Sequence, residues 1–355
     1  MGDSMVKDLC FEIIQTCPNN CLFCSSCAGM DKTFIIEFDV FKRTIDHFMN
    51  LGGIEEISFS GGEPFLHPDL FKMIKYCKDL GIRVVLFTSG VKRNKQLSEE
   101  EMDRLRQVTY DYYSKVKDLP SELIKKYTDN QMSIYEHYNN QVFSSISREE
   151  MEYLFSLGLD KIVFDFQGAE RETYDYLMGS NHFMLVEQSI IRATTVGLDT
   201  DIHFVPMKVN YKELPSLIEI LNIAEIKNLS LLNFVPQGRG ETNKELLMMS
   251  EDEVKEFASI YESCKESFNG TIRVGIPLIN DDKHKCTAGL DKLVIKYDGT
   301  LLPCPAFKEF DTSILNKMGI KTPNIHTDIE SIQVHNGTRA YPLCKKLYDF
   351  NGTIK

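Results

Sequence analysis

At 355 residues, with 43% hydrophobic and 26% charged residues, the chain can form one large domain or two ordinary ones with a sizeable core. Its formal net charge of −12, with no block of Lys or Arg, disfavours a nucleic-acid partner, because such partners need a basic face. No apolar run is long enough to span a bilayer, and residues 1–7 lack a signal-peptide pattern. We therefore expect a cytoplasmic protein with no membrane partner.

Ten cysteines in a reducing compartment favour metal ligation over disulfides. Two of them fit structural positions, because Cys10 lies within an apolar strand pattern and Cys77 on the apolar face of a predicted helix. Free cysteine is among the most buried residue types. We expect both to be buried structural thiols.

The first two predicted strands lead into the strongest local signals. An apolar strand over 9–17 ends at a loop with C-x3-C-x2-C spacing, formed by Cys17, Cys21 and Cys24. A second strand over 56–60 ends at the turn Gly61-Gly62-Glu63-Pro64. Two glycines in succession allow a tight turn and a close approach of the backbone to a ligand.

Strands and helices alternate through most of the first 240 residues. We expect further strands over 83–88, 161–166, 199–206 and 228–235, with helices between them. Six strand–helix units in series predict parallel strands with right-handed crossovers, and so an α/β fold with a partial (β/α)6 TIM barrel. Such barrels build their sites at the C-terminal ends of the strands, where the cysteine loop and the double-glycine turn lie.

Residues 95–147 interrupt this order after the third predicted strand. The segment is polar, helical in patches and rich in tyrosine. Its position predicts a location at the rim of the site. The sequence leaves open whether it is a surface helical hairpin or a lid or substrate-binding cap. Its six tyrosines are Tyr110, Tyr112, Tyr113, Tyr127, Tyr135 and Tyr138.

A second group of cysteines follows residue 240. The turn Asp298-Gly299 lies between two apolar runs and predicts a two-stranded ribbon. This ribbon would bring Cys286 and Cys304 together at its base. We therefore expect a smaller second domain over 241–355, after a core over 1–240.

The cysteine loop and the Gly61-Gly62-Glu63-Pro64 turn together resemble the radical S-adenosylmethionine (radical SAM) superfamily. Three thiolates can hold three irons of a 4Fe–4S cluster, whereas most electron-transfer clusters use four cysteines. The resemblance implies that Cys17, Cys21 and Cys24 bind this cluster and that S-adenosylmethionine chelates the open iron. Reductive cleavage would release a 5′-deoxyadenosyl radical that abstracts hydrogen. Cys27 would be a bystander, because a fourth thiolate would close the open iron.

The same resemblance assigns the cofactor contacts. Glu63 would help bind the methionine ammonium, Phe23 would lie beside the adenine, and Asp165 would accept hydrogen bonds from the ribose. Gln167 could face the substrate. The remaining expected contacts lie in three turns: Gly61, Gly62 and Pro64; Thr88 and Ser89; and Pro236 and Gly238.

One position departs from the family pattern. Many relatives have Arg-Gly after the fourth strand, where this chain has Met178-Gly179. The missing arginine removes an expected partner of the cofactor carboxylate.

The second cysteine group resembles the start of the auxiliary-cluster domain of SPASM and twitch enzymes. This resemblance implies one further iron–sulfur cluster held by Cys286, Cys304 and Cys344, because the additional cysteines of a full SPASM domain are absent. The fourth ligand is left open among Cys264, His284, Asp282 and the substrate itself. A structural zinc site or no metal are the other interpretations.

The family implies the reaction class and leaves the substrate open. Peptide modification of the RiPP type is the leading interpretation, with flavodoxin or ferredoxin as electron donor. Too few residues precede Leu9 for a leader-recognition domain, so we expect a separate leader-binding partner or a role for the tyrosine-rich segment. Small-molecule dehydrogenation or rearrangement is the alternative. A non-catalytic iron–sulfur redox protein is a third possibility, which the double-glycine turn disfavours.

Overall fold

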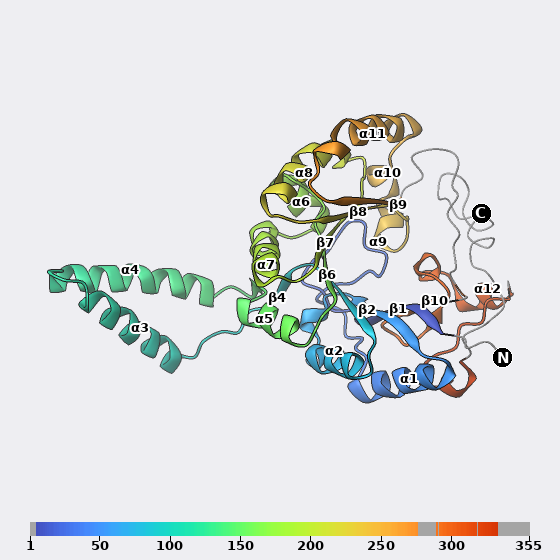
Figure 1. The fold of residues 1–355 in the computed structure, drawn as a ribbon, viewed down its shortest axis with the longest axis horizontal. Coiled ribbons are helices and arrows are strands. Elements are labelled where there is room, and N and C mark those ends of the chain that lie inside the picture. The colour runs from blue at the N-terminus through green and yellow to red at the C-terminus, as the bar shows by residue number, and fades with distance from the viewer. Residues whose placement is uncertain (1–4, 276–288, 290, 318, 333–355) are drawn as a thin grey trace. The chain divides into compact units, whose positions relative to one another are not determined.

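The computed structural model describes residues 5–275, 289, 291–317 and 319–332. Its main element is a nine-stranded sheet in the order β11-β10-β1-β2-β3-β6-β7-β8-β9 (Figure 1). All neighbouring strands are parallel except β10 and β11, which are antiparallel. In chain order the strands are β1 (Val6–Ile14), β2 (Ile54–Gly61), β3 (Arg83–Thr88), β6 (Lys161–Asp165), β7 (Thr200–Phe204), β8 (Asn228–Leu232), β9 (Thr271–Gly275), β10 (Lys292–Ile295) and β11 (Leu301–Leu302).

Helices connect the parallel strands and lie along the outer side of the curved sheet (Figure 1). The predicted α/β fold is confirmed, and a partial barrel is consistent with this curvature. The connecting helices are α1 (Phe38–Leu51), α2 (Leu70–Asp79), α5 (Arg148–Ser156), α6 (Arg171–Met178), α7 (Phe183–Val196), α8 (Leu214–Ile223) and α11 (Glu251–Cys264). The short helices α9 (Arg239–Thr242), α10 (Lys244–Leu247) and α12 (Thr312–Lys317) lie in later connections.

Alternation along β1 separates a packing face from a polar face. Phe11 is fully buried, with its ring 5.3 Å from that of Phe41 in α1, and Phe41 in turn lies 5.6 Å from Phe59 of β2. Successive side chains of a strand point to opposite sides. Cys10 and Glu12 therefore point away from α1, toward the inner side of the sheet.

The predicted ribbon after residue 290 is confirmed and lies in the main sheet. Val294 of β10 pairs with Leu302 of β11, and β10 also pairs with β1 from Asp8↔Lys292 to Phe11↔Ile295. Its apolar side chains pack in a cluster with Phe307 and Leu315. The described part of the predicted second domain thus extends the sheet of the predicted core.

Residues 92–144 form a separate compact unit. Its helices α3 (Glu99–Ser114) and α4 (Ser121–Asn139) form a hairpin, and the short strands β4 (Val91–Arg93) and β5 (Phe143–Ser145) pair with each other. Ser98 and Glu101 form a capping box at the start of α3. The predicted helical character is confirmed, and the choice between surface hairpin and substrate-binding cap stays a prediction.

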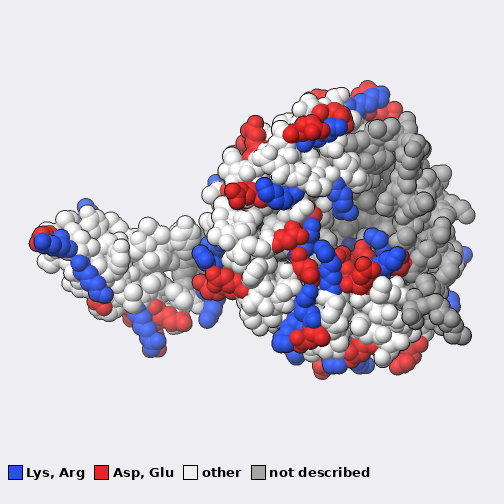
Figure 2. Space-filling model, viewed as in Figure 1, with Lys and Arg blue, Asp and Glu red and all other residues white. Residues whose placement is uncertain are grey.

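Charged side chains of both signs are interspersed over the face drawn in Figure 2. Within the described part of the chain, no helix has the length and apolar character needed to cross a membrane. Cys77 is fully buried, as predicted, and Cys10 is partly buried against the Phe307 cluster.

Candidate functional site

A cavity of about 200 Å³ lies at the C-terminal ends of β1, β2, β3 and β6. It brings together residues that the sequence places far apart, from the cysteine loop to the end of β6. The predicted site residues that line it are Cys17, Cys21, Phe23, Cys24, Gly61, Gly62, Thr88, Ser89 and Asp165.

The three thiols of the cysteine loop surround one space. Burial raises the pKa of Cys17, with the Glu63 carboxylate as a further cause. Burial also raises the pKa of Cys21, as do the charges of Cys17 and Cys24, so the three sulfur atoms influence one another. Cys21 Sγ lies 3.8 Å from Met178 Sδ, at the position where relatives were expected to carry arginine.

This donor set fits an iron–sulfur cluster. Thiolate is the ligand form of cysteine, and thiolates that share one cavity require compensating positive charge such as that of iron. Among the described residues, no three Cys, His, Asp or Glu side chains form a group that could hold a metal ion. The fit to a cluster therefore rests on the cysteine spacing and on the cavity that the three thiols share.

The Gly61-Gly62 turn packs against the end of β1. Gly62 N donates to Ile14 O at 2.6 Å, and Glu63 N donates to Thr16 O at 2.9 Å. A Cβ atom on Gly62 would lie 2.1 Å from Thr16 O, and Gly61 has a φ of 122°. The glycines are therefore required by the close approach of two backbone segments, in addition to lining the cavity.

Glu63 is fully buried and is not among the residues that line the cavity. Its Oε1 accepts hydrogen bonds from Thr88 Oγ1 (2.8 Å) and Phe65 N (3.0 Å). Its Oε2 accepts from Ser89 N (2.7 Å) and Ser89 Oγ (2.6 Å). A carboxylate has about four lone-pair sites, so these bonds occupy Glu63 and join the β2 turn to the β3 turn. A contact with the methionine ammonium would require one of these bonds to be exchanged.

The end of β6 places its two predicted residues differently. Asp165 lines the cavity, and burial together with the nearby Glu63 charge raises its pKa to about 7. Gln167 is fully buried, donates through Nε2 to His203 O (3.1 Å) and accepts at Oε1 from Val205 N (2.8 Å). Instead of facing a substrate, Gln167 joins β6 to the end of β7.

The loop after β8 packs against the cysteine loop. Pro236 is buried away from the cavity. Gly238 has a φ of 55°, and a Cβ atom there would lie 2.7 Å from Cys24 O and 2.9 Å from Cys27 Sγ. The predicted turn therefore packs closely against the backbone of the cysteine loop. Phe23 lines the cavity and also packs against the apolar cluster of Leu177, Met207 and Leu247.

Sequence reasoning missed a buried ion pair in the cavity wall. Lys308 Nζ bonds to Glu12 Oε1, with side-chain exposures of 9% and 1%, and both residues line the cavity. Ser26 Oγ donates to the same Glu12 oxygen at 2.8 Å. The polar residue at position 12 within an apolar strand was the one available signal, and nothing in the sequence places Lys308 beside it.

The second cysteine group is described only at Cys304, whose Sγ accepts from Ala306 N at 3.5 Å. Cys286, Cys344, His284 and Asp282 lie outside the described residues. Cys264 ends α11 and is buried.

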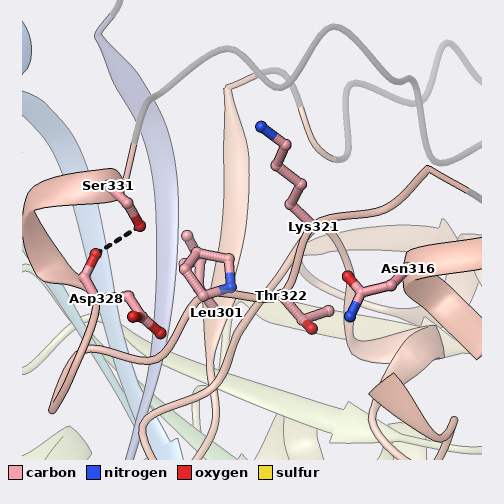
Figure 3. Close-up of a pocket in the computed structure, with 7 residues that line it drawn as sticks. Leu301, Asn316, Lys321, Thr322, Asp328 and Ser331 are labelled. Carbon is pink, nitrogen blue, oxygen red and sulfur yellow. Dashed lines mark hydrogen bonds between the residues drawn. The ribbon is translucent and has the colours of Figure 1, made fainter. Parts of the chain in front are cut away.

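A different cavity, of about 280 Å³, lies beside β11 and α12 (Figure 3). Lys321, Asn316 and Ser331 are among its lining residues, and Ser331 Oγ donates to Asp328 O at 2.7 Å. Asp328 also accepts at its carboxylate from Thr327 Oγ1, at 3.0 Å. These polar groups thus bond within the local turn. None of the predicted site residues lines this cavity.

Comparisons with known proteins agree with this site. Residues 11–115 match the Radical SAM superfamily. The PqqA peptide cyclases of Bradyrhizobium diazoefficiens (21% identity) and Methylobacterium nodulans (22%) each match over 304 residues, 83% of this chain. The chain spans 65% of the length of these curated relatives.

Solved structures share the fold. Streptococcus suis SuiB bound to S-adenosylmethionine superposes with a TM-score of 0.59 at 15% identity, over 92% of this chain and 65% of SuiB. SuiB bound to its precursor peptide SuiA gives 0.58, over 91% of this chain and 63% of that one. The enzyme anSMEcpe with bound AdoMet gives 0.58 at 14% identity, over 90% and 78%. These structures show the same fold, and the residues that match the Radical SAM superfamily, 11–115, include the cysteine loop and the double-glycine turn.

Proposed function

We propose that this chain is a radical SAM enzyme that modifies a peptide substrate of the RiPP type. The observation that carries this proposal is the convergence of the Cys17, Cys21 and Cys24 thiols with the Gly61-Gly62 turn on one cavity. Support for a peptide comes from the relatives, which are named PqqA peptide cyclases, and from SuiB, which was solved with a precursor peptide.

In this proposal, the cluster and S-adenosylmethionine, when bound, supply a 5′-deoxyadenosyl radical that abstracts hydrogen from the substrate. Cys17, Cys21 and Cys24 would hold the cluster. Asp165 would accept hydrogen bonds from the ribose hydroxyls, which it can do when deprotonated. Phe23 would provide an apolar surface for the adenine at the cavity wall.

The remaining side chains shape and enclose the site. Glu63 holds the turns after β2 and β3 together, which fixes Gly61, Gly62 and Ser89 at the cavity edge. The buried Glu12–Lys308 pair closes the wall formed by β1 and the segment after β11. Enclosing this space limits the side reactions that are open to a reactive radical.

We further propose one auxiliary iron–sulfur cluster held by Cys286, Cys304 and Cys344. Its role would be to accept an electron from a substrate radical, with a flavodoxin or ferredoxin as the external donor for the first cluster. The iron and sulfide content of the Cys17/Cys21/Cys24→Ala triple variant tests this step. About four irons remaining per chain would support the auxiliary cluster, and none would contradict it.

The main test is anaerobic incubation of the reconstituted protein with dithionite and S-adenosylmethionine. We expect 5′-deoxyadenosine from the wild type and none from the triple variant. An iron-loaded wild type that forms no 5′-deoxyadenosine would overturn the enzyme assignment.

The substrate class is tested separately, with short peptides encoded next to this gene. We expect mass spectrometry to show loss of two hydrogens, with 5′-deoxyadenosine formed one-for-one. Cleavage of S-adenosylmethionine without any peptide product would favour a small-molecule substrate.

A further inference from the structure

The loop after β8 holds the cysteine loop by three hydrogen bonds to its carbonyl groups. Arg239 N donates to Cys24 O at 3.0 Å, and Arg239 Nε donates to Cys21 O at 2.8 Å. Asn243 Nδ2 donates to Leu22 O at 3.0 Å. Two of the three carbonyls belong to the expected cluster ligands themselves, and the third lies between them.

The spacing between the two loops is fixed from both sides. Gly238 leaves no room for a Cβ atom against Cys24 O and Ser25 O, at 2.7 and 2.8 Å. On the opposite side, Asn20 N donates to Met178 O and Leu22 N donates to Leu177 O. The cysteine loop is therefore held between the end of α6 and the start of α9. Arg239 is the charged residue of the contact with α9.

The Arg239 side chain retains an unused donor. Its Nη2 is buried and has no hydrogen-bond partner among the described residues. Guanidinium stays charged at all accessible pH values, and a buried donor without a partner costs free energy. A negatively charged group beside Nη2 would remove this cost.

We propose that Arg239 is a positioning residue for the cysteine loop and a charge partner of the cluster that Cys17, Cys21 and Cys24 hold. This inference rests on the proposed function, because it requires that cluster. Nε donates to the Cys21 carbonyl, which leaves the buried Nη2 as the donor for the proposed charge contact. A charge-assisted hydrogen bond to a thiolate or sulfide is stronger than a neutral one and favours planar, forked donors.

The charge has a predictable consequence for electron transfer. Reduction adds one negative charge to the cluster. A fixed positive charge nearby stabilises the reduced state more than the oxidised state, which raises the reduction potential. Arg239 would therefore help the cluster accept the electron that cleavage of S-adenosylmethionine requires.

The experiment compares Arg239→Gln with Arg239→Lys in anaerobically reconstituted full-length protein. Iron and sulfide content reports whether Arg239 positions the cysteine loop for cluster binding. An EPR-monitored redox titration reports whether its charge changes the reduction potential of the cluster. The cluster to follow is the one whose EPR signal changes when S-adenosylmethionine is added. Asn243→Ala is the matched control, because it removes a neighbouring bond to the same loop without removing charge.

We expect Arg239→Gln to hold less iron than the wild type, because its bond to Cys21 O is lost. In the iron-loaded fraction, the equilibrium constant for reduction should fall about tenfold, which is about 59 mV for one electron. Arg239→Lys should stay closer to the wild type, and Asn243→Ala should leave the potential unchanged. The thermal midpoints of the apoproteins show whether each variant folds.

Three results would overturn the inference. The first is an unchanged potential in iron-loaded Arg239→Gln. The second is equal loss of iron from the Gln and Lys variants, which would make Arg239 a structural brace alone. The third is a shift in Asn243→Ala as large as that in Arg239→Gln. Failure of the proposed function is seen independently, because a wild type that takes up no cluster fails before any variant is compared.

Discussion

The cavity wall and the α3–α4 hairpin contain the same kind of ion pair in opposite environments. Glu12 and Lys308 are 1% and 9% exposed, whereas Arg106 and Asp129 of the hairpin are 44% and 51% exposed at 2.8 Å. Desolvation opposes a buried pair, and breaking it leaves an uncompensated charge. Water already solvates an exposed pair, so breaking it costs little. Burial, rather than residue type, therefore indicates at which ion pair the loss of one charge costs the most free energy.

The largest effect is expected from the cysteines of the cavity. Cys17→Ala, Cys21→Ala and Cys24→Ala should each abolish S-adenosylmethionine cleavage, because each removes a thiolate ligand of the proposed cluster. Cys27→Ser is the matched control, since Cys27 is absent from the cavity lining. Production of 5′-deoxyadenosine distinguishes them. Retained cleavage in any of the three variants would contradict the ligand assignment.

Breaking the buried pair should have the next largest effect. Lys308→Met leaves Glu12 charged and without its cation, and we expect the free energy of unfolding to fall by about 3–5 kcal/mol. The double variant Glu12→Gln/Lys308→Met should recover much of this loss, because both charges are gone. Urea denaturation of the apoproteins measures both. A double variant as unstable as Lys308→Met would show that packing, and not charge, dominates.

Much of the fold could be predicted because its signals are local. Apolar runs and glycines predicted the six strands β1, β2, β3, β6, β7 and β8. The cysteine loop and the double-glycine turn were found by spacing alone. Their meeting at one cavity followed from the rule that parallel strands share a C-terminal edge.

The remaining features depend on tertiary contacts that no spacing encodes. Gln167 follows a site strand, yet its amide bonds to His203 O in β7 and to Val205 N just after β7. Glu63 has the expected position, but Thr88 and Ser89 supply donors that occupy its oxygens. Lys308 reaches the cavity because β10 pairs with β1, a long-range pairing across about 280 residues of chain.

A smaller, pH-dependent effect should distinguish Asp165 from exposed carboxylates. Its pKa is raised from 3.8 to about 7, first by burial and then by Glu63. Folded protein therefore holds a proton that unfolded protein releases, so this group's contribution to stability is lost as the pH rises from about 4 to 7. Replacing Asp165 with Asn removes that loss.

In the apoprotein, the stability of Asp165→Asn relative to the wild type should increase by about 1–4 kcal/mol between about pH 5 and pH 8. Denaturation at the two pH values measures the change. Asp129→Asn in the hairpin is the control and should show almost none. A flat difference for Asp165→Asn would mean that the site holds this carboxylate ionised.

The smallest effect is expected from the exposed pair of the hairpin. Arg106 lies 2.8 Å from Asp129 and 3.6 Å from Glu136, and all three side chains are largely solvated. Arg106→Ala should lower the free energy of unfolding by about 0.2–1 kcal/mol, and salt should reduce even this value, because exposed charges are screened. Urea denaturation of Arg106→Ala at low and high salt, beside Lys308→Met, gives the direct contrast. A loss in Arg106→Ala as large as that in Lys308→Met would show that Arg106 is buried in solution. That result would favour the hairpin as a packed cap over the hairpin as a free surface element.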